Sequence, residues 1–278
     1  MRRKRFLENR RQQVLAELFI CIAFLALVCV LGILHTDAAK VTDFSRKDLA
    51  PCREFLFGTD WLGRDMLART VKGLSISILI GLLAAGVSAC LALVLGICAA
   101  AGKKAADSVI SFVTDLFLGI PHILLLILIS VCLGKGLLGV TVGIALTHWP
   151  SLARLIRSEV IQLRQMPYIA IARKLGKSRW YIAKKHMLPH LRAQFLVGLV
   201  LLFPHAILHE ASVTFLGFGL SSDQPAIGVI LSESMRYLMT GEWWLALFPG
   251  AMLVIVVFLF YRLGQNLRRM LDPGSVHE

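Results

Sequence analysis

The chain has 278 residues, of which 57% are hydrophobic and only 17% charged, and this composition excludes an ordinary soluble domain. Its formal net charge of +13 would suit a nucleic-acid-binding protein. The Lys and Arg residues, however, gather in a few segments between long apolar runs. The charge therefore indicates membrane topology, and no nucleic-acid partner is predicted.

Six apolar runs approach or exceed the roughly 20 residues that a helix needs to cross a bilayer. Backbone N–H and C=O groups facing lipid must be paired within their own segment, so each run is predicted to be helical. The predicted fold class is all-α, a polytopic membrane protein of about six transmembrane helices. The spans cover about residues 14–34, 73–101, 108–133, 137–156, 191–216 and 244–263.

The distribution of basic residues predicts the orientation of these spans. Lys and Arg are in excess at both chain ends and in the segments after the second and fourth spans, which makes this side cytoplasmic. The other side holds balanced charge. We predict a basic cytoplasmic N-terminus (1–13), an uncleaved first helix (14–34), an external loop (35–72), one membrane domain (73–266) and a cytoplasmic tail (267–278).

The external loop ends in the sequence FGTDWLGRDMLART. Its glycines allow tight turns, and its Asp and Arg side chains can form a local ion-pair network. The block resembles the Gly-Thr-Asp-x-x-Gly-Arg-Asp motif before the second span of dipeptide, oligopeptide and nickel permeases. We expect it to form a rigid cap on the helix ends, in preference to contacting substrate. The matching residues are Gly58, Thr59, Asp60, Gly63, Arg64 and Asp65.

Small residues recur every four positions from Gly73 to Ala89 in the second span and predict close helix packing. Gly102-Lys103-Lys104 after this span is not a phosphate-binding loop, because the glycine before it has the wrong spacing and no Ser or Thr follows the lysine. In the third span, Asp115 is expected to be structural, and His122 is expected to pack or to bond a carbonyl rather than to bind a ligand.

A basic segment at 168–190 separates the fourth and fifth spans. Its first half predicts an amphipathic helix that stops at Gly176, and a second short helix is predicted to end at Leu188-Pro189, since proline lacks the N–H of a continuing helix. The segment resembles the coupling signature of ABC-importer permeases, whose short helices dock on a cytoplasmic ATPase. The residues implied in ATPase coupling are Tyr168, Ala170, Ala172, Gly176, His186, Leu188 and Pro189.

Two positions of this segment depart from the signature, because Ala170 replaces the usual glutamate and Ile171 the usual alanine. These departures concern the usual acidic contact to the ATPase and leave the loop itself intact. The alternative is a basic helix lying on anionic lipid. Lipid binding alone, however, requires neither the internal glycine nor the terminal Leu-Pro.

The fifth span carries the sharpest chemical signal, FPHAILHEAS at 203–212. His205 and His209 are four residues apart on one helical face, and two imidazoles at this spacing can hold one divalent metal ion. Imidazole suits nickel, copper or zinc better than magnesium or calcium. With Glu210 and the deep His148 of the fourth span, they form the predicted metal or substrate pathway. Two helix-packing histidines are the alternative.

Further motifs extend the resemblance over Gly58 to Pro273. FLGFGL at 215–220 is similar to a segment shared by peptide and nickel permeases, and LGQNLRRMLDPG is similar to the family's closing motif, with Gln265 in place of Asp. Nickel permeases carry the His-x-x-x-His pattern, whereas peptide permeases usually have small or aliphatic residues there. The chain is therefore similar to dipeptide/oligopeptide/nickel ABC permeases, and most similar to the nickel type.

This resemblance implies a MetI-like importer permease of a bacterial inner membrane, working by alternating access. The implied partners are a second, related permease, two cytoplasmic ATP-binding-cassette ATPases that bind ATP, an extracytoplasmic substrate-binding protein and lipid. The chain would be no enzyme and would hold no catalytic residue or prosthetic group; nickel or another divalent transition metal would be transient cargo.

Three other functions compete with this one. The cargo could instead be a dipeptide or oligopeptide, and a permease of that type would not depend on His205 and His209. An ATPase-independent secondary carrier would be expected to show inverted repeats, which the sequence lacks. A membrane enzyme would need a catalytic set, but no Ser/His/Asp set and no His-Glu-x-x-His motif is evident.

Overall fold

The computed structural model describes residues 10–271. Within this range the chain consists of helices and loops, and its β structure is confined to one isolated bridge between Thr59 and Asp65. Five helices are long and apolar enough to cross a membrane, and a bent pair makes up to six. The predicted all-α membrane fold is thereby confirmed. The predictions for 1–9 and for 272–278, including Pro273, fall outside the described residues.

The helices follow one another along the chain with one long loop after the first and short connections elsewhere. They are α2 (Arg10–Leu34), η1 (Phe44–Arg46), α3 (Met66–Ala101), α4 (Lys104–Gly119), α5 (His122–Cys132), α6 (Gly136–Thr147), α7 (Trp149–Arg164), α8 (Pro167–Lys174), α9 (Arg179–Ile182), the π-helical turn η2 (Ala183–Met187), α10 (Leu188–Phe215), α11 (Ile227–Ser234), η3 (Met235–Tyr237) and α12 (Trp244–Leu271).

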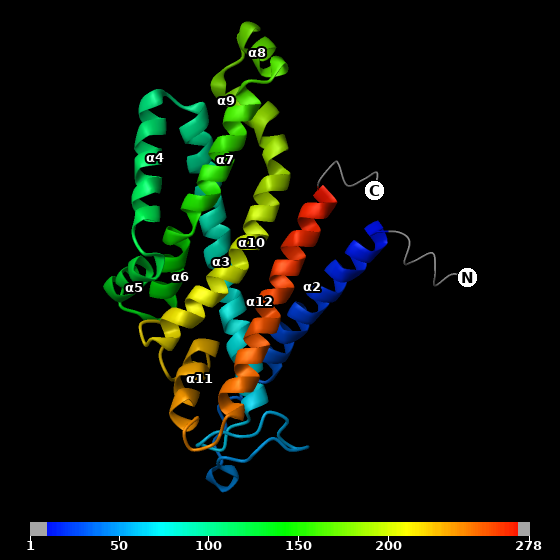
Figure 1. The fold of residues 1–278 in the computed structure, drawn as a ribbon, viewed down its shortest axis with the longest axis vertical. Coiled ribbons are helices and arrows are strands. Elements are labelled where there is room, and N and C mark those ends of the chain that lie inside the picture. Colours follow the sequence, from blue (N-terminus) through cyan, green and yellow to red (C-terminus); the bar gives the residue numbers. More distant parts are fainter. Residues whose placement is uncertain (1–9, 272–278) are drawn as a thin grey trace, which may run out of the picture.

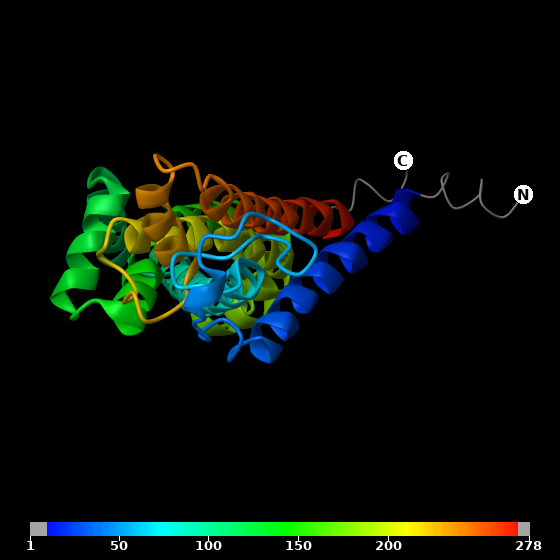
Figure 2. The same cartoon turned by 90° about the horizontal axis from the view of Figure 1, so that it is seen from below.

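The helices form an elongated bundle with two different ends (Figure 1). The loop that carries α8 and α9 lies at one end, and the loop between α2 and α3 lies at the other. In both views α2 and α12 stand together at one side, away from α4 and α5 (Figure 2). An ion pair between Glu17 Oε2 and Arg262 Nη2, which are 2.7 Å apart, joins α2 to α12. The bundle thus separates the two sequence motifs along its long axis.

Helix α3 lies in the middle of the bundle and packs against α2, α7 and α10. The small residues of its predicted stripe are buried, which lets neighbouring backbones approach closely. A Cβ added at Gly81 would lie 2.9 Å from Cγ1 of Ile207 on α10. The predicted packing role of the stripe is confirmed.

The predicted third span is not one straight helix. Helix α4 ends at Gly119, and Ile120 is extended because the ring of Pro121 disfavours a helical residue before it. Helix α5 then starts at His122, and the two helices are bent by 97°. The prediction of a single rod over 108–133 is therefore wrong, because the backbone turns sharply at Pro121.

Several predicted boundaries are also wrong. Helix α3 begins at Met66 rather than 73, because Asp65 caps it, so the external loop ends at 65 rather than 72. Helix α12 continues to Leu271, beyond the predicted domain end at 266. Leu188-Pro189 ends no helix: Pro189 lies in the first turn of α10, directly after the π-helical turn η2, and the helical run continues from Trp180 to Phe215.

Candidate functional site

At the end of the bundle that carries the loop between α2 and α3, Asp60 is the centre of a buried ion network. Its side chain is fully buried and accepts hydrogen bonds from Arg64 Nε at 2.7 Å and from Arg69 Nη1 at 2.5 Å. Arg69 also donates from Nη2 to Glu233 Oε2 at 2.8 Å, which links α3 to the end of α11. Asp60 accepts two further bonds from the backbone N–H groups of Leu62 and Arg64. The network ties the external loop to two helices.

The other motif residues shape the backbone around this network. Thr59 Oγ1 accepts from Leu49 N at 2.9 Å and donates to Arg46 O. Gly58 and Gly63 have φ of +72° and +71°, and a Cβ at Gly63 would overlap Asp43 O. Asp65 caps the N-terminus of α3, where its Oδ1 accepts a hydrogen bond from Leu67 N at 2.8 Å. Each of the six motif residues therefore has a structural contact in the cap that the external loop forms.

At the opposite end, α8 is closed by a two-bond C-terminal turn. Lys177 N donates to Ala172 O at 3.1 Å and Gly176 N donates to Arg173 O at 3.0 Å, the pattern of a Schellman motif. Such a turn needs one left-handed residue, and Gly176 supplies it with φ +73°. Ile169 and Ala172 bury the inner face of α8. The glycine therefore sets the angle between α8 and α9.

Apolar side chains cover the outer side of this loop. Ile171 in α8 and Leu175 at its C-terminal end are 57% and 71% exposed, and Trp180 in α9 is 74% exposed. Large exposed apolar side chains gathered in one loop are typical of a contact surface for another protein. We call these three residues the outer apolar face.

The remaining residues of the predicted coupling set lie where the loop meets η2 and the start of α10. The Tyr168 ring lies 6.2 Å from the His186 ring and 6.0 Å from the His190 ring, measured between centroids. Ala170 is exposed, while Leu188 and Pro189 begin α10. The loop is thus connected rigidly, through η2, to the helix that carries the histidines of the fifth span.

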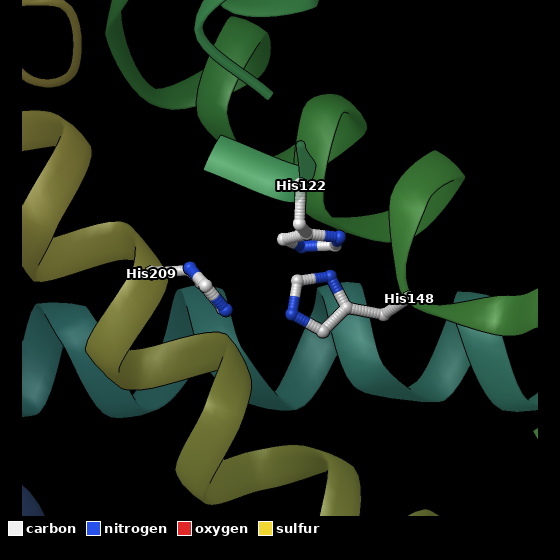
Figure 3. Close-up of side chains that lie close together, drawn as sticks. All are labelled: His122, His148 and His209. Atoms are coloured by element: carbon white, nitrogen blue, oxygen red, sulfur yellow. The ribbon is translucent and has the colours of Figure 1, made fainter. Parts of the chain in front are cut away.

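Three histidines from α5, from the α6–α7 junction and from α10 lie close together (Figure 3). His122 begins α5, His148 joins α6 to α7, and His209 lies on α10. Their ring centroids are 4.4 Å apart for His122–His148, 4.6 Å for His122–His209 and 5.1 Å for His148–His209. We call these residues the three-histidine cluster.

Only some of the predicted pathway residues lie together in the structure. His148 and His209 are brought together, whereas His205 is exposed and lies outside the three-histidine cluster. Glu210 is fully buried, and its Oε1 accepts from Thr214 Oγ1 at 3.0 Å within α10. His122, expected to pack or to bond a carbonyl, takes the place predicted for His205. His205 and His209 lie one turn apart on α10, but His205 is not one of the three histidines whose nitrogens gather within 4.8 Å, so its expected part in binding an ion stays a prediction.

The family of the chain follows from its sequence. Residues 92–275 match the model of the family described as binding-protein-dependent transport system inner membrane component, which covers more than half of the chain. The chain belongs to this family. It is a multi-pass inner-membrane permease of the ABC-importer type, and such a permease works with ATPases and a substrate-binding protein.

Curated relatives of this permease are similar along almost its whole length. It is 35% identical to a putative peptide transport system permease protein of Brucella suis, over 97% of this chain and 90% of that protein. It is 30% identical to the dipeptide transport system permease protein DppC of Bacillus subtilis, over 95% and 83%. It is also 30% identical to the glutathione transport system permease protein GsiD of Pectobacterium atrosepticum, over 97% and 89%.

A solved structure shares the fold of this permease. An inward-facing structure of the MetNI methionine ABC transporter superposes with a TM-score of 0.61 and 19% identity, covering 74% of this chain and 98% of that one. This likeness supports the predicted MetI-like architecture and concerns the fold alone.

Sequence reasoning missed two functional features of the permease. No spacing rule could join His122 to His148 and His209, because the three come from helices whose contact depends on the bend at Pro121. Arg69 and Glu233 were not singled out, although an arginine close to an apolar span is a usable signal for a buried ion pair.

Proposed function

We propose that the permease lines one half of a translocation pathway, with a second related permease lining the other. The loop 168–190 docks in a groove of a cytoplasmic ATPase, and both chain ends lie on the same cytoplasmic side. The observation that carries this proposal is the outer apolar face, held by Gly176 at one end of a fold of this family. Movement of the docked loop passes through η2 into α10, which alternates access to the pathway.

We further propose that the cargo is a dipeptide or oligopeptide. The support comes from relatives named for dipeptide, peptide and glutathione transport that align over most of their length. The nickel cargo expected from His205 and His209 has no such support, so the peptide alternative is preferred. In proteoliposomes holding the assembled transporter and its binding protein, ATP should drive uptake of a labelled dipeptide. ATP-driven uptake of Ni²⁺ with no uptake of any peptide would contradict this cargo.

Docking predicts a specific effect at Gly176. Changing Gly176→Val should uncouple transport, because a β-branched residue at φ +73° is strained by about 1–2 kcal/mol or more. A strain of this size lowers the population of the turn that docking needs by about 5–30-fold. A Cβ here meets nothing within 4 Å, so the strain comes from the backbone and not from crowding. ATP-dependent uptake per assembled transporter measures the effect.

The matched control is Gly176→Asn, because asparagine tolerates the left-handed conformation at a helix C-terminus. This variant should retain most uptake and should assemble in the same amount as Gly176→Val. Equal uptake by the two variants and the native transporter would refute a docking role that depends on this turn.

A further inference from the structure

The three-histidine cluster is a concentration of donor atoms with no counterpart in ordinary helix packing. In the described part of the chain, one nitrogen from each of His122, His148 and His209 lies within 4.8 Å of the other two. The three side chains point toward one another from α5, from the α6–α7 junction and from α10 (Figure 3). Three polar rings are costly to place inside a membrane bundle, and the hydrogen bonds between Thr147 Oγ1 and His122 Nε2 at 3.4 Å and between His148 Nδ1 and Ile144 O at 2.9 Å satisfy them only in part.

His148 is held in the form that a metal ion requires. Its Nδ1 lies 2.9 Å from the carbonyl oxygen of Ile144, and a carbonyl only accepts, so Nδ1 carries the proton. In the neutral ring the lone pair is then on Nε2. That atom is buried and has no hydrogen-bond partner in the structure, and the residue as a whole is only 8% exposed. A carbonyl bond that orients a ligating imidazole is typical of metal sites.

From this geometry we propose that His122, His148 and His209 form a three-imidazole site for a divalent transition-metal ion. Metal–nitrogen bonds of 2.0–2.1 Å in a tetrahedral site place donor atoms roughly 3.4 Å apart, so small side-chain rotations bring the three together. Imidazole donors select zinc, nickel, cobalt or copper over magnesium and calcium. His122 and His209 are half-buried, so the site stays open on one side for a further ligand.

Charge identifies the class of that further ligand. Three neutral imidazoles leave the positive charge of the ion uncompensated, which is unfavourable in a low-dielectric interior. Glu210, the acid next to His209, is buried within its own helix contact to Thr214 and is not in the cluster. An anionic donor from outside the chain therefore completes the site, and a peptide carboxylate can supply it; this last step rests on the proposed function.

Cobalt binding to the purified, assembled transporter tests the site. After removal of metal by a chelator, Co²⁺ is titrated while its visible absorption, which reports tetrahedral coordination, is recorded. The native transporter should show this absorption, with Zn²⁺ competing. His122→Ala, His148→Ala and His209→Ala should each weaken Co²⁺ binding by about 10-fold or more. If His148→Ala fails to assemble, the test uses His122→Ala and His209→Ala, the variants of the two half-buried histidines.

His205→Ala is the matched control, since this residue lies one turn from His209 but outside the cluster. It should bind Co²⁺ as the native transporter does. Native-like binding by both His122→Ala and His209→Ala, or loss of binding in His205→Ala, would overturn the proposal, as would absence of Co²⁺ binding to the native transporter. Gly176→Val should keep the Co²⁺ absorption while losing uptake, so the metal site and the docking role can fail separately.

Discussion

Changing Asp60→Asn is expected to destabilise the permease by about 3–5 kcal/mol, because it leaves the buried Arg69 and the partly buried Arg64 with one carboxylate fewer. Glu233 still pairs with Arg69, but the site gains a net positive charge where water is excluded. The thermal midpoint of the purified transporter, followed by size-exclusion chromatography after heating, should fall by on the order of 10 °C.

Asp65→Asn is the control for this change, because it removes the same charge five residues away in the same motif. Asp65 only caps α3, and asparagine is about as good a cap as aspartate, so the midpoint should move little. If the two variants lowered the midpoint equally, the buried network around Asp60 would not be the source of stability.

The second large effect is expected at Trp180 on the outer apolar face. Trp180→Asp should abolish coupled transport, because a buried aromatic anchor in a protein interface commonly contributes 2 kcal/mol or more and a carboxylate would be buried without a partner. The side chain is 74% exposed in the isolated chain, so the substitution should leave the fold of the permease unaltered. Co-purification of the ATPases with the permease measures the docking.

Trp180→Phe retains an apolar ring at this position and should restore most co-purification. Retention of the ATPases by Trp180→Asp at native levels would exclude the outer apolar face as the docking surface. The same result combined with loss of vesicle binding would instead favour the lipid-surface alternative for this loop.

The loop 168–190 and the three-histidine cluster are connected through one helix, α10. The loop 168–190 continues through η2 into α10, and α10 carries His209. The partner histidines belong to α5 and to the α6–α7 junction, which are separate elements. If the loop docks and moves as proposed, a metal ion bound by all three would join helices that move relative to one another, and binding would depend on the transport state.

Local patterns were sufficient for much of the fold. Apolar runs predicted the membrane spans, since lipid leaves a backbone no alternative to helix, and the small residues of α3 predicted its central packing. The positions of Gly176 and of the external motif predicted turns because only glycine adopts positive φ without strain. Boundaries failed at Pro121 and Pro189, where proline breaks one helix and begins another.

Composition, run length and residue spacing along the chain thus predicted the helical membrane fold and its spans, because these depend on interactions within a few turns. Only the packed bundle decided that His209 meets His122 and His148 instead of His205, and that Arg69 reaches both Asp60 and Glu233. Such contacts join residues far apart in sequence, and their geometry depends on helix bends and crossing angles that no local pattern encodes.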